Sequence, residues 1–402
     1  MESVSADAPG LLPAHVQRGN IWRLTVAQAL AGANSVVVYA TGAIIGATLA
    51  PAPVLATLPI SLFVLGMAAS ILPAGLLARR HGRRAAFQMG TGAGVLTGLL
   101  AMVAVVLGWF WLFCLATFCG GVYAAVVLSF RFAAADGVAP RQRPRALSFV
   151  MAGGIAAGVV GPQLVSLTMD LWPVHRFAVT FLMQAVVAAV AGVILSGVRV
   201  PPPSAAERAG GRPLAVIVAQ PRFIVAAVCG AVSYMLMNFL MTAAPLAMHL
   251  CGLPQTSANL GLQWHVIAMY APSFVTGRLI MRFGAVRIAV IGLLLIGGAS
   301  AVGLGGETEP YFWAMLIVLG LGWNFGFLGA SAMVLDTHAP EEKTRVQSLN
   351  DFIVFGVMVA GSFSSGGILS AYGWHSVLTL SFLPLALVLG VLTVLGLRRI
   401  FA

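Results

Sequence analysis

Two pairs of side chains in this sequence could bind a soft metal ion. Met237 and Met241 are four residues apart, and so are His265 and Met269. A spacing of four puts both members of a pair on one helix face, about 6 Å apart along the axis. Thioether sulfur and imidazole nitrogen are ligands that suit Cu(I). The four residues are therefore candidate metal ligands, provided that their helices turn these faces to one cavity.

Cysteines stand on both sides of the methionine pair. Cys229 precedes it and Cys251 follows it. A thiol that binds a metal is deprotonated, and these two are candidate relays that pass a soft metal to and from the site. A plainer interpretation stays open, because methionine is also a common filler of apolar helices.

The composition decides what kind of protein positions these side chains. The chain has 402 residues, of which 60% are hydrophobic and only 8% are charged, whereas soluble proteins carry about 25% charged residues. Apolar runs long enough to cross a bilayer recur along it. They lack the alternation of barrel strands, so the spans are expected to be helices. We expect an all-α membrane protein that is not an enzyme and has no prosthetic group, because no nucleophile–base pair and no phosphate-binding loop stands out.

Twelve spans are expected. In chain order they cover about residues 21–49, 53–78, 85–107, 109–135, 146–170, 177–197, 222–248, 257–280, 286–304, 310–335, 348–370 and 374–397.

The basic residues predict how the spans are oriented. The net charge is +11, and if the spans alternate, the arginines of the loops gather on one side, with only Arg176 on the other. Because Lys and Arg are retained in the cytoplasm, both termini are predicted to be cytoplasmic. This placement accounts for the charge without nucleic acid as a partner.

One long polar connection divides the spans into two sets of six. Pro, Gly, Ser and Arg dominate it, as expected for a linker. The predicted organisation is a cytoplasmic tail (1–20), a six-helix half (21–197), a cytoplasmic linker (198–221), a second six-helix half (222–397) and a short cytoplasmic tail (398–402).

The two halves repeat each other in sequence. After the second span of each half, Gly75 and Gly82 correspond to Gly277 and Gly284. After the fourth span, five residues recur 200 positions later, and two of the five pairs are charged. These five pairs are Asp136 and Asp336, Ala139 and Ala339, Pro140 and Pro340, Arg145 and Arg345, and Ser148 and Ser348. Repeated halves related along the membrane normal place a binding site between them, near the midplane.

These loops resemble those of the major facilitator superfamily, whose loop after the second span runs G-x-x-x-D-R-x-G-R-R. Five residues fit this pattern, namely Gly75, Arg80, Gly82, Arg83 and Arg84, whereas Arg79 stands at the acidic position. Asp136 is a candidate anion for this arginine cluster. The resemblance implies a secondary transporter of twelve helices in two six-helix pseudo-repeats, working by alternating access.

The main functional interpretation comes from a closer resemblance. M-x-x-x-M in span 7 and H-x-x-x-M in span 8, with cysteines on both sides of the first pair, resemble the CcoA-type copper importers of this superfamily. The resemblance implies a bacterial inner-membrane protein that imports copper for assembly of cbb3-type cytochrome oxidase. It implies Met237, Met241, His265 and Met269 as ligands, with Cys229 and Cys251 as the matching thiols. Cys114 and Cys119 depart from that pattern.

A second resemblance supports an alternative substrate. RFAAAD in span 4 and LQWHVIAMYAPSFVTGRLI in span 8 are also similar to the RfnT-type riboflavin transporters. A flavin, or another small organic solute, needs aromatic faces for stacking and amides for hydrogen bonds. The residues that could supply them are Tyr123, Tyr234, Asn238, Trp264, Trp323 and Asn324.

Drug export is a third alternative. The stretch GGIAAGVVGPQL in span 5 resembles in part the glycine–proline motif of drug/proton antiporters. However, no Asp or Glu stands in the middle of any expected span. Proton-driven transporters and exporters of cationic drugs usually keep such a carboxylate, so this class is less favoured.

Overall fold

The computed structural model describes residues 12–135, 138, 143–199, 212–339 and 342–394. These residues form helices, with no β-strand among them. The N-terminal helices are α1 (Ala14–Leu49), α2 (Leu58–His81), α3 (Arg83–Leu107), α4 (Phe110–Val127), α5 (Phe130–Ala135), α6 (Arg143–Thr168) and α7 (Ala178–Ser196), with short 3-10 turns η1 (Pro53–Leu55) and η3 (Pro173–His175). The C-terminal helices are α9 (Leu214–Val218), α10 (Pro221–Leu250), α11 (Gln255–Tyr270), α12 (Ser273–Phe283), α13 (Ala285–Leu304), α14 (Glu309–Leu335), α15 (Lys343–Leu380) and α16 (Phe382–Val394).

The expected twelve crossings are present in the described part of the chain. Ten stretches are long and apolar enough to cross a membrane. One of them, Arg345–Thr393, is broken at Gly373, where φ is 78° and ψ is 178°, and it therefore holds two crossings. The helices α11 and α12 together make one further crossing, interrupted at Ala271 and Pro272. The all-α fold with its twelve crossings confirms the predicted fold class.

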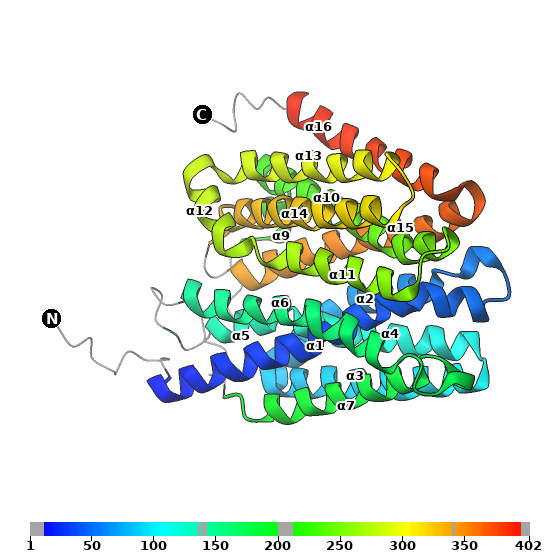
Figure 1. Ribbon diagram of the computed structural model, residues 1–402. Helices are drawn as coiled ribbons and strands as arrows, with labels where there is room; N and C mark the ends of the chain where they lie inside the picture. The colour runs from blue at the N-terminus through cyan, green and yellow to red at the C-terminus, as the bar shows by residue number, and fades with distance from the viewer. Residues whose placement is uncertain (1–11, 136–137, 139–142, 200–211, 340–341, 395–402) are drawn as a thin grey trace.

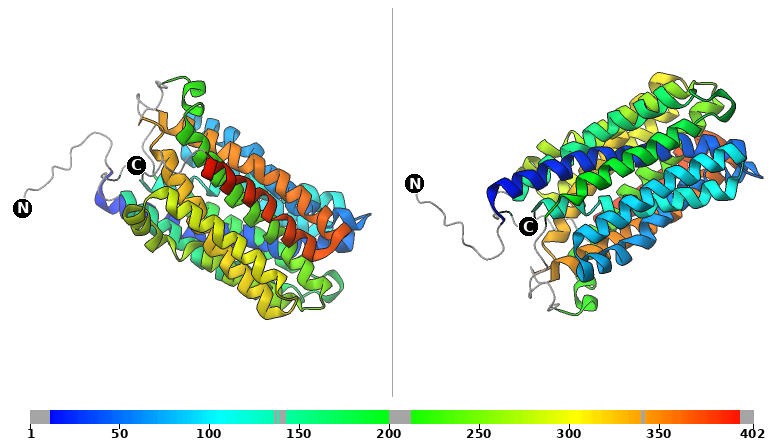
Figure 2. Two further views of the ribbon diagram at one scale, coloured as in Figure 1. Left: turned by 90° about the horizontal axis from the view of Figure 1, so that it is seen from above. Right: turned by 90° about the horizontal axis from the view of Figure 1, so that it is seen from below.

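The helices form two bundles that lie side by side (Figure 1). We call α1–α7 the N-terminal bundle and α9–α16 the C-terminal bundle. They meet where α6 packs against α11, α2 against α15 and α1 against α10, and Figure 2 shows each bundle from its outer side. This arrangement puts the faces of six helices along the junction between the bundles.

The double bundle has two ends, which we call the proximal end and the distal end. The proximal end carries the start of α1 at Ala14 and the glycines Gly82 and Gly284; the distal end carries the α1–α2 connection and Gly373. α1 begins at Ala14, several residues before the predicted start of the first span, so it extends about 10 Å further at 1.5 Å per residue. The predicted boundaries of the two halves and the linker stay a prediction.

Equivalent glycines have the same backbone conformation in the two bundles. Gly82 separates α2 from α3 with φ of 84° and ψ of 161°, and Gly284 separates α12 from α13 with φ of 87° and ψ of 148°. Only glycine adopts this region readily, because a Cβ would be strained there. The repeat seen in the sequence is thus also a repeat of backbone geometry.

Candidate functional site

Aromatic side chains fill the junction between the two bundles at mid-depth. Tyr234 of α10 is at their centre, and its ring makes edge-to-face contacts with Trp323 (centroids 5.3 Å apart), Phe327 (5.1 Å) and Phe355 (5.0 Å). Trp323 and Phe327 of α14 stack at 5.2 Å with an interplanar angle of 15°. Three helices of the C-terminal bundle therefore supply one aromatic surface.

The N-terminal bundle completes this surface with Tyr39 of α1 and Phe63 of α2. Their rings lie 5.6 Å apart, edge to face, and both pack into one apolar cluster with Phe355 and Tyr234. The Tyr39 hydroxyl donates a hydrogen bond to Oδ1 of Asn238 on α10, at 2.7 Å. We call Tyr39, Phe63, Tyr234, Tyr270, Trp323, Phe327 and Phe355 the aromatic cluster.

Two hydrogen-bond donors at this cluster are buried without a partner. They are Nδ2 of Asn238 and Nε1 of Trp323, and the two side chains are 0% and 3% exposed. A buried polar group that makes no hydrogen bond costs about 1–3 kcal/mol, so such groups are rare in native proteins. Both donors are therefore available to a ligand that presents acceptor atoms beside flat, stacking faces.

Asn324, which the sequence suggested as a cavity residue, instead braces the break between α11 and α12. Its Nδ2 donates to the carbonyl of Met269 at 2.6 Å and to Oγ of Ser273 at 2.8 Å. Its Oδ1 accepts from Thr276 at 2.6 Å. Pro272 has no N–H to continue the helix, and Asn324 supplies the hydrogen bonds that hold the broken segment in place.

Tyr270 is the last residue of α11, directly before this break. A Cβ on Gly154 of α6 would lie 2.9 Å from the Tyr270 ring, so the ring rests on the backbone of the opposite bundle. The Tyr270 ring also makes an edge-to-face contact with Trp323, and the two ring centroids are 6.1 Å apart. The break in span 8 thus presents an aromatic residue to both bundles at once, as discontinuous transporter helices often do at substrate sites.

The four proposed metal ligands are all buried. Nδ1–H of His265 donates to the carbonyl of Leu316 on α14 at 2.7 Å. Met269 lies on the same face of α11 and is 6% exposed. On α10, Met237 follows Ser233 by one turn, and the Ser233 hydroxyl packs against Gly326 of α14. Met237 and Met241 are 3% and 4% exposed, so both pairs are buried in the C-terminal bundle.

The proposed thiols lie far from a common site. Cys229 is buried near the start of α10, and Cys251 is exposed after its end. Partial burial and the neighbouring carboxylate of Glu307 raise the pKa of the Cys251 thiol, which donates to that carboxylate at 3.7 Å. Among residues 12–135, 138, 143–199, 212–339 and 342–394, no group of three or more His, Cys, Asp or Glu side chains is arranged to hold a metal. The role of the methionines and His265 as metal ligands stays a prediction.

Two other suggested flavin contacts lie away from the aromatic cluster. Tyr123 packs its ring on Gly94 inside the N-terminal bundle, and Trp264 of α11 is 45% exposed and makes none of the ring contacts of the aromatic cluster. Five members of the aromatic cluster were not predicted from the sequence: Tyr39, Phe63, Tyr270, Phe327 and Phe355. Their signal was weak, because an aromatic residue in an apolar span does not reveal which neighbour it faces.

The predicted gating residues occupy the proximal loops. Arg80 and Arg84 are exposed, Arg83 is half-buried, and open space surrounds the Cα atoms of Gly75 and Gly277. In the equivalent C-terminal loop Asp336 is exposed and Arg345 is half-buried. Asp136 lies outside the described residues. The gating role of these residues stays a prediction.

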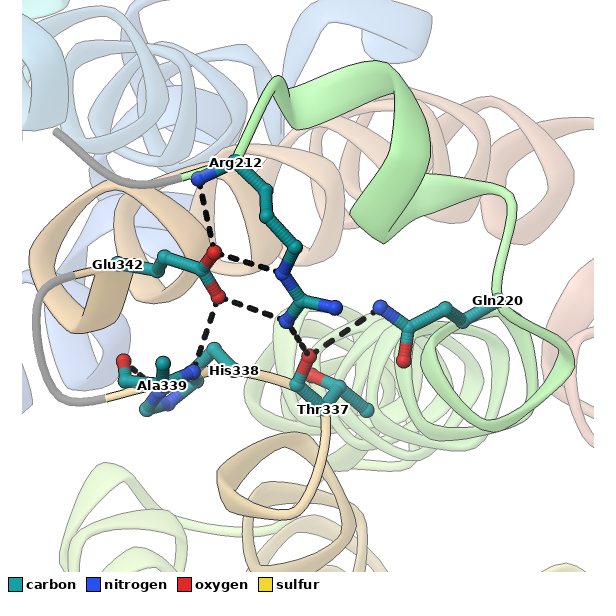
Figure 3. Close-up of polar contacts among 6 residues, drawn as sticks. All are labelled: Arg212, Gln220, Thr337, His338, Ala339 and Glu342. Carbon is teal, nitrogen blue, oxygen red and sulfur yellow. Dashed lines mark hydrogen bonds and ion pairs between the residues drawn. The ribbon is translucent and has the colours of Figure 1, made fainter.

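The sequence also gave no sign of a charged clamp at the end of the linker (Figure 3). Nε and Nη2 of Arg212 donate to the two carboxylate oxygens of Glu342 at 2.7 and 2.8 Å, and the Arg212 backbone N–H donates at 2.9 Å. The Glu342 side chain is 3% exposed and also accepts from the Ala339 N–H. Arg212 and Gln220 further donate to the carbonyl of Thr337. We call these residues the linker clamp.

The linker clamp controls the ionisation of Glu342. The hydrogen bonds from the Arg212 guanidinium, followed by those from the backbone N–H groups of Ala339 and Arg212, hold the pKa of Glu342 far below its usual range. The same hydrogen bonds raise the pKa of Arg212. The pair is therefore fully charged at neutral pH and joins the linker end to the α14–α15 connection.

A family profile and similar proteins of known sequence point to the same family. The profile of the Major Facilitator Superfamily matches residues 24–262 and residues 226–400. The riboflavin transporter RfnT of Brucella anthropi is 46% identical over 376 residues, which cover 92% of this chain and 94% of that protein. The uncharacterized MFS-type transporter YdeG of Bacillus subtilis is 29% identical over 389 residues, covering 92% and 89%. These relatives give copper import no support.

One solved structure is similar to this chain in fold. The crystal structure of a bacterial homolog to the human lysosomal transporter Spinster, in an inward-facing and unoccupied conformation, matches with a TM-score of 0.66 at 15% identity. The match covers 97% of this chain and 87% of that one.

Proposed function

The chain belongs to the Major Facilitator Superfamily and is a membrane transporter, and from that premise we propose that its substrate is riboflavin. The observation that carries the proposal is the aromatic cluster with its two free donors, Asn238 Nδ2 and Trp323 Nε1. An isoalloxazine ring is flat and carries carbonyl oxygens and ring nitrogens that accept hydrogen bonds. The relative from Brucella anthropi, similar over nearly its whole length, is named for the same substrate.

The site is shared by two bundles, which fits transport by alternating access. Tyr39 donates to Oδ1 of Asn238 and so joins α1 to α10, whereas Nδ2 of Asn238 is free for the solute; the solute therefore binds to a residue that links the two bundles. We propose that the bundles rock around the aromatic cluster and expose it first to one side and then to the other. We further propose that the proximal end faces the cytoplasm of a bacterial inner membrane, because Lys and Arg are retained on the cytoplasmic side and the exposed arginines Arg80 and Arg84 lie at this end.

Uptake of radiolabelled riboflavin tests the substrate. Cells that cannot make riboflavin are given the wild-type chain, Trp323→Phe or Trp264→Phe, at equal protein levels. Trp323→Phe removes the free Nε1–H and part of the stacking face, and we expect uptake to fall by about tenfold or more, since stacking and a hydrogen bond are each worth about 1 kcal/mol. Trp264→Phe is the matched control, because that indole is 45% exposed and lies outside the aromatic cluster, and we expect it to be silent.

The same cells decide between riboflavin and copper. Met237→Leu keeps volume and apolarity but removes the sulfur, so it should be silent for riboflavin. Radioactive copper uptake by the wild-type chain, lost in Met237→Leu, together with no riboflavin uptake, would show that the substrate is the metal.

A further inference from the structure

Five hydrogen bonds join the two bundles between the aromatic cluster and the distal end. Ser61 of α2 and Ser362 of α15 lie with their Oγ atoms 3.2 Å apart, both buried. Gln163 of α6 donates to Oε1 of Gln263 on α11 at 3.0 Å. At the outermost layer, Ser370 of α15 donates to the carbonyl of Pro53 at 3.1 Å.

The other two bonds form a relay across the junction. Nε2 of Gln255, the first residue of α11, donates to the carbonyl of Ala40 on α1 and to Oδ1 of Asn259, each at 3.0 Å. Nδ2 of Asn259 then donates to Oγ of Ser166 on α6 at 2.9 Å. One side-chain pair on α11 therefore holds two helices of the opposite bundle.

The helices approach closely at the same level. A Cβ on Gly366 of α15 would collide with both Oγ1 and Cβ of Thr57, just before α2. Rotation of the Thr57 side chain moves Oγ1 but leaves Cβ in place, so the contact depends on glycine. A Cβ added to the next residue, Gly367, would meet only a Val54 methyl group, at an ordinary contact distance of 3.8 Å.

From these contacts we infer that the five hydrogen bonds and the Gly366–Thr57 contact form a distal seal that closes the route from the distal side to the aromatic cluster. This inference rests on the proposed transport function. The side chains that make the seal are Ser, Thr, Gln and Asn, which carry no charge. Such groups exchange their bonds for water without leaving a buried charge unpaired, so the distal seal can open in every transport cycle.

A disulfide across the distal seal tests the inference. Ser61→Cys with Ser362→Cys is made in a Cys251→Ser background, which removes the exposed native thiol. Oxidation should abolish riboflavin uptake, and dithiothreitol should restore it. The matched control is Ser300→Cys with Ser381→Cys, whose hydroxyls lie 2.6 Å apart within the C-terminal bundle; its disulfide should leave uptake unchanged.

Mass spectrometry of the linked peptides shows whether each disulfide has formed. Full uptake by the linked Ser61→Cys, Ser362→Cys protein would overturn the distal seal. Riboflavin uptake that is missing from the wild-type chain itself would instead overturn the proposed substrate. In that event the distal seal is tested by labelling Ser166→Cys with an impermeant maleimide in intact cells: protection after cross-linking supports the seal, and unchanged labelling contradicts it.

Discussion

The distal seal and the linker clamp fasten the protein in opposite ways. The distal seal joins the two bundles to each other through uncharged side chains such as Ser61 and Gln255. The linker clamp joins residues that all belong to the C-terminal side, through a charged pair in which Glu342 is almost fully buried. At the other end of the linker, Asn20 of α1 exchanges two hydrogen bonds with the backbone of Arg199, again within one bundle.

The charge of the side chains determines which of the two contacts can break during transport. Removing one partner from a buried ion pair leaves an uncompensated charge, which is strongly destabilising. Removing an uncharged hydrogen bond costs less, about 0.5–1.5 kcal/mol, if water can replace the partner. The charged clamp therefore keeps the linker end fixed to its bundle, whereas the distal seal leaves the bundles free to separate.

We expect the largest effect from a substitution that adds volume inside the distal seal. Gly366→Ala adds a methyl group that collides with Thr57, so the bundles can no longer close at the distal end. We expect riboflavin uptake to fall by about tenfold or more, because the step that requires closure is blocked. Gly367→Ala, one residue later, adds a methyl group that only touches Val54 at 3.8 Å; it is the matched control and should transport normally. Equal uptake by the two variants would remove the Gly366 contact from the distal seal.

A smaller effect is expected from breaking the linker clamp. Arg212→Ala leaves the Glu342 carboxylate buried with only backbone donors, so the melting temperature should fall by about 5 °C. Arg176→Ala is the control, because Arg176 is about as exposed as Arg212 but its partner Asp170, 2.9 Å away, is 63% exposed, whereas Glu342 is 3% exposed. Exposed pairs contribute little to stability. Equal losses in the two variants would show that the linker clamp is an ordinary surface contact.

The sequence predicted the positions of the helices well, but it did not predict which helix faces contact each other. Apolar runs and glycines placed the spans, and Gly82, Gly284 and Gly373 all mark breaks between helices. The spacing of His265 and Met269 correctly put both on one face of α11. Which neighbour that face contacts is set by the packing of α11 against α14, about 50 residues further along the chain, and no local pattern reports it.

The same limit applies to the aromatic cluster. Tyr234 and Trp323 were recognisable as candidates because a flavin needs stacking faces. The partner of Asn238, however, is Tyr39, 199 residues earlier in the chain. Asn324 is a polar residue in an apolar span, which suggested a substrate contact, yet its hydrogen bonds close the break at Pro272. A polar residue inside a span thus indicates a need for hydrogen bonds, and the structure decides whether the backbone or a ligand supplies them.

The stability that the linker clamp contributes should depend on pH, and this is the smallest of the expected effects. The linker clamp holds the pKa of Glu342 far below its usual range, whereas in the unfolded chain the pKa returns to about 4.3. A carboxyl group with a lowered pKa in the folded state stabilises fully above its unfolded pKa, and this stabilisation declines as the pH falls toward the folded value. We expect the melting temperature of the wild-type chain to exceed that of E342Q most at pH 6–7, and this difference to shrink steadily toward pH 3. Asp170→Asn, in the exposed pair, should show a small difference throughout, and a gap for E342Q that stays constant with pH would mean that the charge of Glu342 contributes nothing to the linker clamp.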